Sequence, residues 1–329
     1  MAPLRWLQWS RVDLAGGLGG VEVFARSLNR ELLKAGIQSK LSRDPRDLLD
    51  PNWDVIQMHG SAFERVPRTK AIRVQTLHGT TLGRMSSCGE WLWPGGYLAW
   101  LRELQGVVLS DVTLSVRPLA TARLADKTGG ISRVCWNGWD SSEEMAPLPQ
   151  ALEAQLSGLG SFWIYIGRGE DLVKGADRLL RALPLCRKLR LVAVPGSGFE
   201  SAPGVIRSGS LSSPQVRALM GRAEGIVIPS RYEGNSLAML EALAHGLRVL
   251  ATRVGAAELH PKGVQGLHLI SSADADHPER LAGVILDAAM EPGDRQTRAA
   301  NNQKVLPRWA DVARTAIEAV RSRLRAGSP

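Results

Sequence analysis

Short apolar segments alternate with amphipathic helical patterns along most of the chain, and this alternation constrains the fold more than any other feature. The strand-like segments are 5–9, 53–59, 72–78, 112–116, 133–137, 162–167, 189–196, 225–230 and 248–252. Helical spacing of apolar residues occupies 20–35, 175–183, 214–223, 236–245 and 278–290. A repeated order of strand, helix and strand predicts a doubly wound α/β fold with parallel sheets.

The predicted strands are too many for one ordinary sheet, which has about four to six. The segment 141–160, SSEEMAPLPQALEAQLSGLG, also breaks the alternation. A chain of 329 residues is long enough for two domains. We therefore expect two Rossmann-like domains that face each other across a cleft, with a boundary inside 141–160.

Charge and composition narrow the function. Lys and Arg number 41 against 32 Asp and Glu, a net charge of +9, which favours anionic partners such as nucleotide phosphates, an anionic glycan or a membrane surface. No RRM-like, KH-like or zinc-finger signature is present, so no nucleic acid partner is expected. Three cysteines without metal-binding spacing indicate neither a disulfide framework nor a zinc site.

The apolar runs bear on localisation. The run at 106–116 is far shorter than the roughly 20 residues that span a bilayer, and the first ten residues lack a signal-peptide core. Together with the cysteine pattern, these features lead us to expect a cytoplasmic protein.

Two features of the first half follow predicted strands, where open α/β sheets bind their ligands. A glycine-rich loop before the helix at 20–35 would let a ligand approach the backbone closely; its glycines are Gly16, Gly17, Gly19 and Gly20. A plain flexible turn remains the alternative. His59 and His78 end neighbouring strands and form a second candidate, with a purely structural role as the alternative.

The second half carries two further candidates. Arg168 follows a strand and Lys174 precedes a helix, in a loop kept open by Gly167, which predicts a clamp for a diphosphate. Glu233 lies in a polar loop, and Glu241, eight positions later, lies inside an apolar helix. A carboxylate placed there needs a partner, because burying an unpaired charge is costly, and a ligand hydroxyl would serve.

These motifs carry a family resemblance. GGLGGVE, TLHGT, NGWD, GRGEDLVKG and PSRYEGNSLAMLEALAHGLRVLATRVGAAE together resemble glycosyltransferase family 4, the retaining GT-B-fold enzymes also called glycosyl transferases group 1. The E-x7-E pair and the G-R-x5-K-G loop are the most specific elements. The resemblance implies an acceptor-side domain of 1–145 plus a returning helix in 306–329, and a donor-binding domain of 146–305.

The resemblance also implies roles for individual residues. Glu233 would meet the hydroxyls of the transferred sugar, Glu241 the nucleotide ribose, and His78 the sugar near its 6-position. Arg168 and Lys174 would bind the diphosphate and stabilise the leaving group. Backbone N–H groups for the sugar and phosphates would come from Gly234, Asn235, Ser236 and Leu237. On the first domain, Gly19 and Gly20 would face the donor, whereas Gly16, Gly17 and His59 would face the acceptor.

The implied donor is a UDP-, GDP- or ADP-linked sugar, without a cofactor or a metal. The D-A-D sequence at 274–276 looks like a metal motif, but it precedes a helix, where an aspartate usually acts as a cap. Two departures from the family pattern make the sugar pocket unusual. Asn235–Ser236 replaces the common Phe–Gly, and Gly255-Ala256-Ala257-Glu258 replaces two glycines before a glutamate.

The acceptor side contains an aromatic segment with Trp91 and Trp93. Such rings stack on sugars or lie at membrane interfaces, whereas a hairpin packed on the core is the alternative. We expect a glycan or glycolipid acceptor, such as a cell-envelope glycan, a lipopolysaccharide or a lipid-linked sugar. The expected setting is peripheral association with an anionic membrane surface at the cytoplasmic face of the inner membrane.

Two other classes of function remain as alternatives. An NAD-dependent oxidoreductase would also have two Rossmann domains, but the sequence lacks G-x-G-x-x-G followed by an acidic residue about 20 positions later. A catalytically silent relative that binds sugar or nucleic acid is opposed by the presence of Glu233, Glu241, Arg168 and Lys174.

Overall fold

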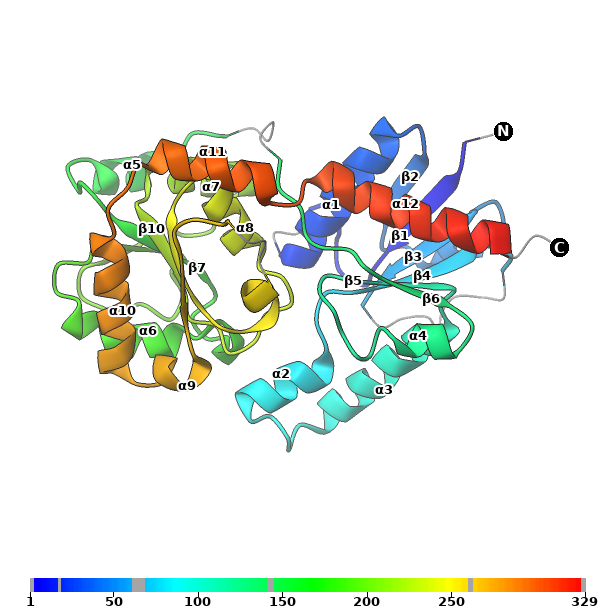
Figure 1. Ribbon diagram of the computed structural model, residues 1–329, viewed down its shortest axis with the longest axis horizontal. Helices are drawn as coiled ribbons and strands as arrows, with labels where there is room; N and C mark the ends of the chain where they lie inside the picture. Colours follow the sequence, from blue (N-terminus) through cyan, green and yellow to red (C-terminus); the bar gives the residue numbers. More distant parts are fainter. Residues whose placement is uncertain (1–2, 17–18, 61–68, 141–144, 260–262, 327–329) are drawn as a thin grey trace. The chain divides into compact units, whose positions relative to one another are not determined.

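The computed structural model describes residues 3–16, 19–60, 69–140, 145–259 and 263–326. The chain divides into two compact units. Unit 1 comprises Met1–Gly138 and Pro307–Pro329, and unit 2 comprises Trp139–Leu306. Figure 1 shows both as layers of helices around a twisted sheet.

Unit 1 is built on a parallel six-stranded sheet in the order β2-β1-β3-β4-β5-β6. Its strands are β1 (Arg5–Trp9), β2 (Gln38–Ser42), β3 (Val55–His59), β4 (Ile72–Leu77), β5 (Val112–Ser115) and β6 (Ile131–Val134). Its helices are α1 (Gly20–Lys34), α2 (Thr81–Cys88), α3 (Pro94–Leu109), α4 (Leu124–Lys127) and α12 (Trp309–Ala326), with a 3-10 turn at η1 (Pro45–Leu49). The strand order reverses between β1 and β3.

Unit 2 has a second parallel six-stranded sheet, in the order β12-β11-β10-β7-β8-β9. Its strands are β7 (Trp163–Gly167), β8 (Leu191–Pro195), β9 (Val205–Arg207), β10 (Gly225–Ile228), β11 (Arg248–Thr252) and β12 (Leu267–Ile270). Counted from β7, this is the Rossmann order 3-2-1-4-5-6. Successive strands are added on one side of β7 up to β9 and on the other side from β10 onward. The strand order therefore reverses between β7 and β10, and the carboxyl ends of these two strands are the expected ligand site.

The helices of unit 2 are α5 (Gln150–Leu156), α6 (Ala176–Ala182), α7 (Ser213–Arg222), α8 (Leu237–Ala244), α9 (Ser272–Ala275), α10 (Pro278–Met290) and α11 (Arg295–Val305). Short 3-10 turns occur at η3 (Leu172–Lys174), η4 (Leu183–Leu185) and η5 (Gly255–Leu259). None of the described helices has both the length and the hydrophobicity that crossing a membrane requires.

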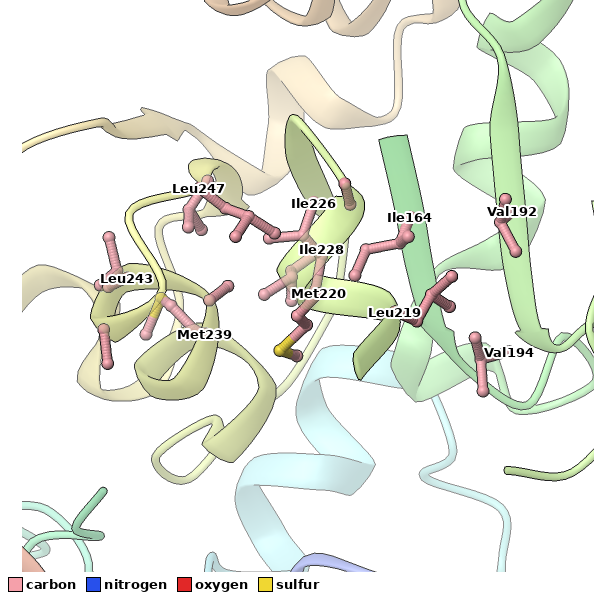
Figure 2. Close-up of a cluster of buried hydrophobic side chains, with 14 of the residues drawn as sticks. Ile164, Val192, Val194, Leu219, Met220, Ile226, Ile228, Met239, Leu243 and Leu247 are labelled. Carbon is pink, nitrogen blue, oxygen red and sulfur yellow. The ribbon is translucent and has the colours of Figure 1, made fainter. Parts of the chain in front are cut away.

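Buried apolar side chains cover both faces of the unit 2 sheet. On one face, Ile164, Ile226 and Ile228 from the strands pack with side chains of α7 and α8, as Figure 2 shows. The α7 helix starts in a capping box in which Ser212 and Gln215 satisfy each other's backbone N–H groups. The sheet and these helices form a rigid base for the loops at the carboxyl ends of the strands.

The C-terminal helix α12 belongs to unit 1, as the resemblance implied, and lies beside α1 (Figure 1). Trp309 is buried at the start of α12, and its ring meets that of Phe24 edge-on at a centroid distance of 5.6 Å. The two passages of the chain between the units are close on the unit 2 side, because Trp139 Nε1 donates to the Leu306 carbonyl at 3.4 Å.

The predicted fold class is confirmed, whereas several elements differ from the predicted ones. The sequence pattern missed β2, β9 and β12, and it placed β6 two residues too late. All four are edge strands with partly exposed side chains, so they lack the apolar run of a buried strand. The units also divide at 138/139 rather than at 145/146, because Trp139 packs in the core of unit 2.

Gly138 permits a close approach between the end of the first segment of unit 1 and α12. A Cβ atom at this position would lie 2.5 Å from the Trp309 nitrogen and 2.7 Å from the Arg308 carbonyl carbon. We predict that Gly138→Ala lowers the free energy of unfolding of unit 1 by about 1–3 kcal/mol, since the backbone must shift to relieve the overlap. Chemical denaturation of the full chain measures this loss.

Gly283→Ala is the matched control. Gly283 lies inside α10, and a Cβ there would meet nothing within 4 Å. Because alanine favours a helix interior over glycine by up to about 1 kcal/mol, this variant should be as stable as the parent or more stable. Equal stability of Gly138→Ala and the parent would contradict the close approach.

Candidate active site

The loops that follow β7 and β10 meet at the reversal point of the unit 2 sheet. The first loop contains Arg168 and Lys174, and the second contains Glu233. Lys174 Nζ donates to Glu233 Oε1 at 2.8 Å, and Ser230 Oγ donates to the same oxygen at 2.9 Å. The structure therefore brings together two of the charged side chains predicted for the site.

The Lys174 side chain is 35% exposed and that of Glu233 is 13% exposed, so the pair is shielded but reachable. Burial alone would lower the pKa of Lys174, but the Glu233 carboxylate outweighs it, and the pKa is raised. Lys174 thus stays a cation at neutral pH, as a phosphate ligand must.

Arg168 has a different environment. Its guanidinium is 72% exposed and lies 3.5 Å from the Asp171 carboxylate. A pair this exposed contributes little to stability. Arg168 is therefore able to turn to a bound anion at small cost.

Further contacts fix the two loops to each other. The Arg231 backbone N–H donates to the Val173 carbonyl at 2.8 Å. The Arg231 guanidinium also binds both carboxylate oxygens of Asp177, at 2.6 and 2.7 Å. Sequence reasoning missed Arg231, although it lies inside the PSRYEG motif.

A buried arginine on α6 anchors the end of β10. Arg178 is 2% exposed and donates to the carbonyl oxygens of Pro229 at 3.1 Å and Ser230 at 3.3 Å. Its charge is balanced by Asp276, which accepts from it at 2.8 and 2.9 Å. The pKa of Asp276 is lowered chiefly by the hydrogen bond from Arg178. Sequence reasoning missed this residue too; the available signal was a cation between Ala176 and Leu179, both of which are buried.

Two glycines allow these loops to approach. Gly175 has a φ of +68°, and a Cβ on it would lie 2.1 Å from the Pro229 carbonyl oxygen. Gly255 has a φ of +66°, and its Cβ would lie 2.3 Å from the Glu233 carbonyl oxygen. Side chains at these positions would separate the loops and shift Glu233.

The segment after Glu233 leads directly into α8. Gly234, Asn235 and Ser236 are buried, and Ser236 caps α8 by accepting from the Met239 N–H at 3.4 Å. Leu237 starts the helix, and Glu241 lies half-buried one turn further on. This order places the α8 N-terminus, which favours anions, next to Glu233. Gly167 ends β7, and its Cβ would lie 3.2 Å from Lys174 Cβ.

The two predicted histidines of the first half meet in unit 1 at a cavity of about 330 Å³. It lies at the carboxyl ends of β1, β3 and β4, and both His59 and His78 line it. His59 Nδ1 lies 3.0 Å from His78 Nε2, and His59 Nε2 lies 3.1 Å from Gln8 Oε1. With Gln8 Oε1 as an acceptor, His59 Nε2 carries its proton, and His78 Nε2 donates to His59 Nδ1.

The histidine pair is neutral at pH 7. Burial lowers the pKa of His78 to about 4, and burial followed by the neighbouring His78 lowers the pKa of His59 well below 6.5. Phe24 packs edge-on against both rings, at centroid distances of 5.9 and 4.9 Å. The pair therefore offers neutral hydrogen-bonding groups to the cavity.

The described glycines of the predicted loop do not line this cavity, although the helix α1, which they lead into, does. Gly19 is the N-cap of α1, Gly20 is its first residue, and Val21 lines the cavity. Gly16 lies in the preceding turn, while Gly17 lies outside the described residues.

Trp91 and Trp93 do not line the cavity. They lie in and next to the α2–α3 turn, 48% and 42% exposed, and Arg84 packs over the Trp93 ring at 5.5 Å. Within the described part of the chain, no group of three or more His, Cys, Asp or Glu side chains is arranged to hold a metal ion. Of the aspartates in the D-A-D sequence, Asp274 pairs with Arg280, and Asp276 pairs with Arg178.

Comparisons with known proteins agree with this architecture. Residues 161–289 match the family model described as Glycosyl transferases group 1, which confirms the predicted resemblance. The chain is 38% identical over 86 residues to the MMP alpha-(1->4)-mannosyltransferase of Mycolicibacterium hassiacum, covering 26% of this chain and 21% of that protein. It is 27% identical over 252 residues to the glycogen synthase of Mycobacterium tuberculosis, covering 69% and 56%. The chain thus spans about half or less of these curated relatives.

Solved structures share the fold. Sucrose-phosphate synthase from Thermosynechococcus elongatus superposes with a TM-score of 0.79 at 15% identity, covering 98% of this chain and 100% of that chain. Anabaena HepE in complex with UDP and glucose superposes with a TM-score of 0.69 at 17% identity, covering 97% and 100%. The two parallel sheets and the returning helix are those of the GT-B fold.

The histidine pair predicts a dependence of stability on pH. Unfolded histidines take up protons near pH 6.5, whereas His78 in the folded protein does so only near pH 4. Acidification from pH 7 to 5 therefore favours the unfolded state, by roughly 1–2 kcal/mol for this residue. We predict that His78→Gln flattens the dependence of unfolding free energy on pH in this range.

Urea denaturation at pH 7, 6 and 5 compares the two slopes. Glu103, whose pKa is raised by burial, contributes with the opposite sign, but it is present in both proteins and largely cancels in the comparison. Parallel pH profiles for the parent and His78→Gln would show that His78 is not held neutral.

Proposed function

We propose that this chain, whose second unit matches the glycosyl transferases group 1, is a retaining glycosyltransferase that moves a sugar from a nucleotide-diphosphate sugar to a hydroxyl acceptor. One observation carries the proposal: Lys174 pairs with Glu233 at the reversal point of a Rossmann sheet, beside the N-terminus of α8, and Arg168 lies in the same loop as Lys174. Cations and a helix N-terminus suit a diphosphate, and a carboxylate suits sugar hydroxyls.

Each side chain then has a distinct task. Lys174 and Arg168 bind the diphosphate and stabilise the negative charge that grows on it as the sugar leaves. The hydrogen bonds described for Glu233 both reach Oε1, so we assign Oε2 to the sugar hydroxyls. Glu241, inside α8, is assigned to the ribose, and the N–H groups from Gly234 to Leu237 to the sugar and phosphates.

The transfer step follows the front-face displacement that the family resemblance implies. The bond between the anomeric carbon and the phosphate oxygen breaks, and a bond from that carbon to the acceptor oxygen forms on the same face. The acceptor proton passes to a donor phosphate oxygen, so the products are the glycosylated acceptor and the nucleotide diphosphate. In this scheme Lys174 and Arg168 stabilise the charge on the departing diphosphate, and no protein base is needed.

The first nucleotide to test is uridine diphosphate, because HepE, which shares the fold, is known in complexes with UDP and with UDP-glucose. GDP- and ADP-linked sugars belong in the same screen. A ligand present at 100 times its dissociation constant stabilises the folded protein by about 2.7 kcal/mol, which a thermal-shift screen detects.

We extend the proposal to a glycan or lipid-linked acceptor of the cell envelope, reached at the cytoplasmic face of a membrane. The α2–α3 hairpin exposes six large apolar side chains within eleven residues, namely Trp91, Leu92, Trp93, Tyr97, Leu98 and Leu101. Leu92 at the tip is 96% exposed. Aromatic rings with polar tips suit a membrane interface, and the net charge of +9 favours an anionic one.

Alanine at Lys174 tests the catalytic assignment. If Lys174 stabilises charge that appears only during bond breaking, Lys174→Ala lowers kcat by about 100-fold or more, while the donor KM rises less. Steady-state kinetics at saturating acceptor separates the two parameters. Lys188→Ala, at an exposed lysine elsewhere in unit 2, is the control and should leave both unchanged.

A rise in KM with kcat preserved would instead mean that Lys174 holds the ground state and transition state equally well. Calorimetry with UDP, GDP and ADP on the full chain decides the wider proposal. No binding of any nucleotide diphosphate to the parent protein would refute it.

Vesicle binding tests the membrane assignment. We predict that the parent sediments with phosphatidylglycerol vesicles and that Leu92→Asp reduces the bound fraction about tenfold, since burying one such side chain is worth roughly 1.5–3 kcal/mol. Met290→Asp is the matched control. Met290 is 81% exposed on unit 2, and its replacement introduces the same negative charge as Leu92→Asp. Equal losses for the two variants, or a parent that does not sediment, would contradict the assignment.

A further inference from the structure

The unit 1 cavity contains a carboxyl group that the proposed donor chemistry does not use. Glu103, on α3, lines the cavity and is 8% exposed. Its Oε2 accepts from the Thr81 N–H at 2.9 Å and from the Thr81 hydroxyl at 3.0 Å. Its other oxygen, Oε1, is buried and has no hydrogen-bond partner among the residues that the structure describes. A buried acceptor left without a donor costs free energy, and a ligand that donates to it recovers that cost.

Glu103 also occupies the place where an anionic ligand would bind. Thr81 is the first residue of α2, and a helix N-terminus attracts negative charge. Here the carboxyl group of the protein itself takes the Thr81 N–H. A phosphate at this position would lose that donor and would meet a second negative charge whenever Glu103 is ionised.

The described lining of the cavity offers no compensating cation. None of the described residues that line it is Lys or Arg. Its two histidines are held neutral, because burial lowers the pKa of both. Val12, Val21 and Leu77 add apolar surface beside the polar groups. Hydroxyl groups on one side and C–H groups on the other are the chemistry of an uncharged sugar or cyclitol.

We infer that Glu103 determines acceptor specificity: the unit 1 cavity binds a neutral polyhydroxylated ring, one hydroxyl of which donates to Glu103 Oε1, and it discriminates against a phosphorylated ring. This inference rests on the proposed function only in treating the ring as the acceptor. The net charge of +9 therefore does not argue for an anionic ligand here, because the described lining residues of this cavity include no Lys or Arg. A cavity of about 330 Å³ lies at the small end of the range for ligand sites, about 300–1,000 Å³, as suits one ring.

Glu103→Gln is the decisive variant. Its amide oxygen can still accept from Thr81 and keep the start of α2 intact, whereas its NH2 group replaces the unpartnered oxygen with a donor. NMR titrations by saturation transfer would use the full chain with D-glucose, D-mannose and myo-inositol, and with glucose 6-phosphate and mannose 6-phosphate. We expect at least one neutral ring to bind more tightly than the phosphates, and Glu103→Gln to weaken its binding by roughly tenfold or more.

The same variant should narrow or reverse the preference for the neutral ring over the phosphorylated one. Glu90→Gln is the matched control: it removes one carboxylate at the other end of the α2 helix, outside the cavity lining, and should leave the binding unchanged. Glu233→Ala distinguishes the two binding sites. Sugar held in the donor site loses the carboxylate assigned to its hydroxyls in this variant, whereas ring binding in unit 1 is retained.

Results that contradict the specificity of the cavity differ from results that contradict the proposed transferase function. Three results would overturn the inference even if a nucleotide diphosphate binds. The parent could bind the sugar 6-phosphates more tightly than the neutral rings, Glu103→Gln could bind the neutral ring with unchanged affinity, or no neutral ring could bind. Binding of a neutral ring that depends on Glu103, in a protein that binds no nucleotide diphosphate, would support the specificity of the cavity and refute the transferase proposal instead.

Discussion

The arrangement of the candidate donor site depends on one buried arginine. Arg178 holds the carbonyl groups at the end of β10, and Asp276 balances its charge from the other side. Arg178 is 2% exposed and Asp276 is 46% exposed, so removing Asp276 would leave a buried cation without its counter-charge, which costs more than the loss of a surface ion pair. The loop that carries Glu233 therefore starts from a fixed point, and Lys174 meets a carboxylate whose position is set before any ligand arrives. Preorganisation of this kind is what electrostatic catalysis requires.

The sequence was sufficient for the parts of the fold that are buried on both sides. Interior strands such as β1 and β11 match their predicted limits, because a strand covered on two faces is made mostly of apolar residues. Edge strands behave differently. β2 reads QSKLS and β12 reads LHLI, and their partly exposed side chains leave no run to detect. Their existence follows from pairing with a neighbouring strand, which is information that a single segment does not contain.

The site shows the same division. Arg168, Lys174 and Glu233 stand in loops with recognisable spacing, so the sequence identified them as candidates. Arg178 and Glu103 were missed, because each lies inside a helix and acts on a segment 22 or more positions away. Trp91 and Trp93 were assigned to the acceptor because their aromatic segment lies in the first domain, with a hairpin packed on the core as the alternative. Their exposure at the turn of a hairpin could not be predicted from the sequence. Whether a side chain faces a cavity, a neighbouring loop or solvent is decided by tertiary packing.

The double passage of the chain between the units has a consequence for how such a protein is assembled. In unit 2, the Trp139 side chain is hydrogen-bonded to the Leu306 carbonyl. In unit 1, Gly138 lies against the backbone of Trp309. In topological terms, unit 2 is an insertion whose two ends are held together within the rest of the chain. An insertion with adjacent ends can be exchanged as a cassette without altering the course of the host chain. The part proposed to bind the donor is therefore separable by two cuts, while the cavity at Glu103 and the helix α12 stay with the host.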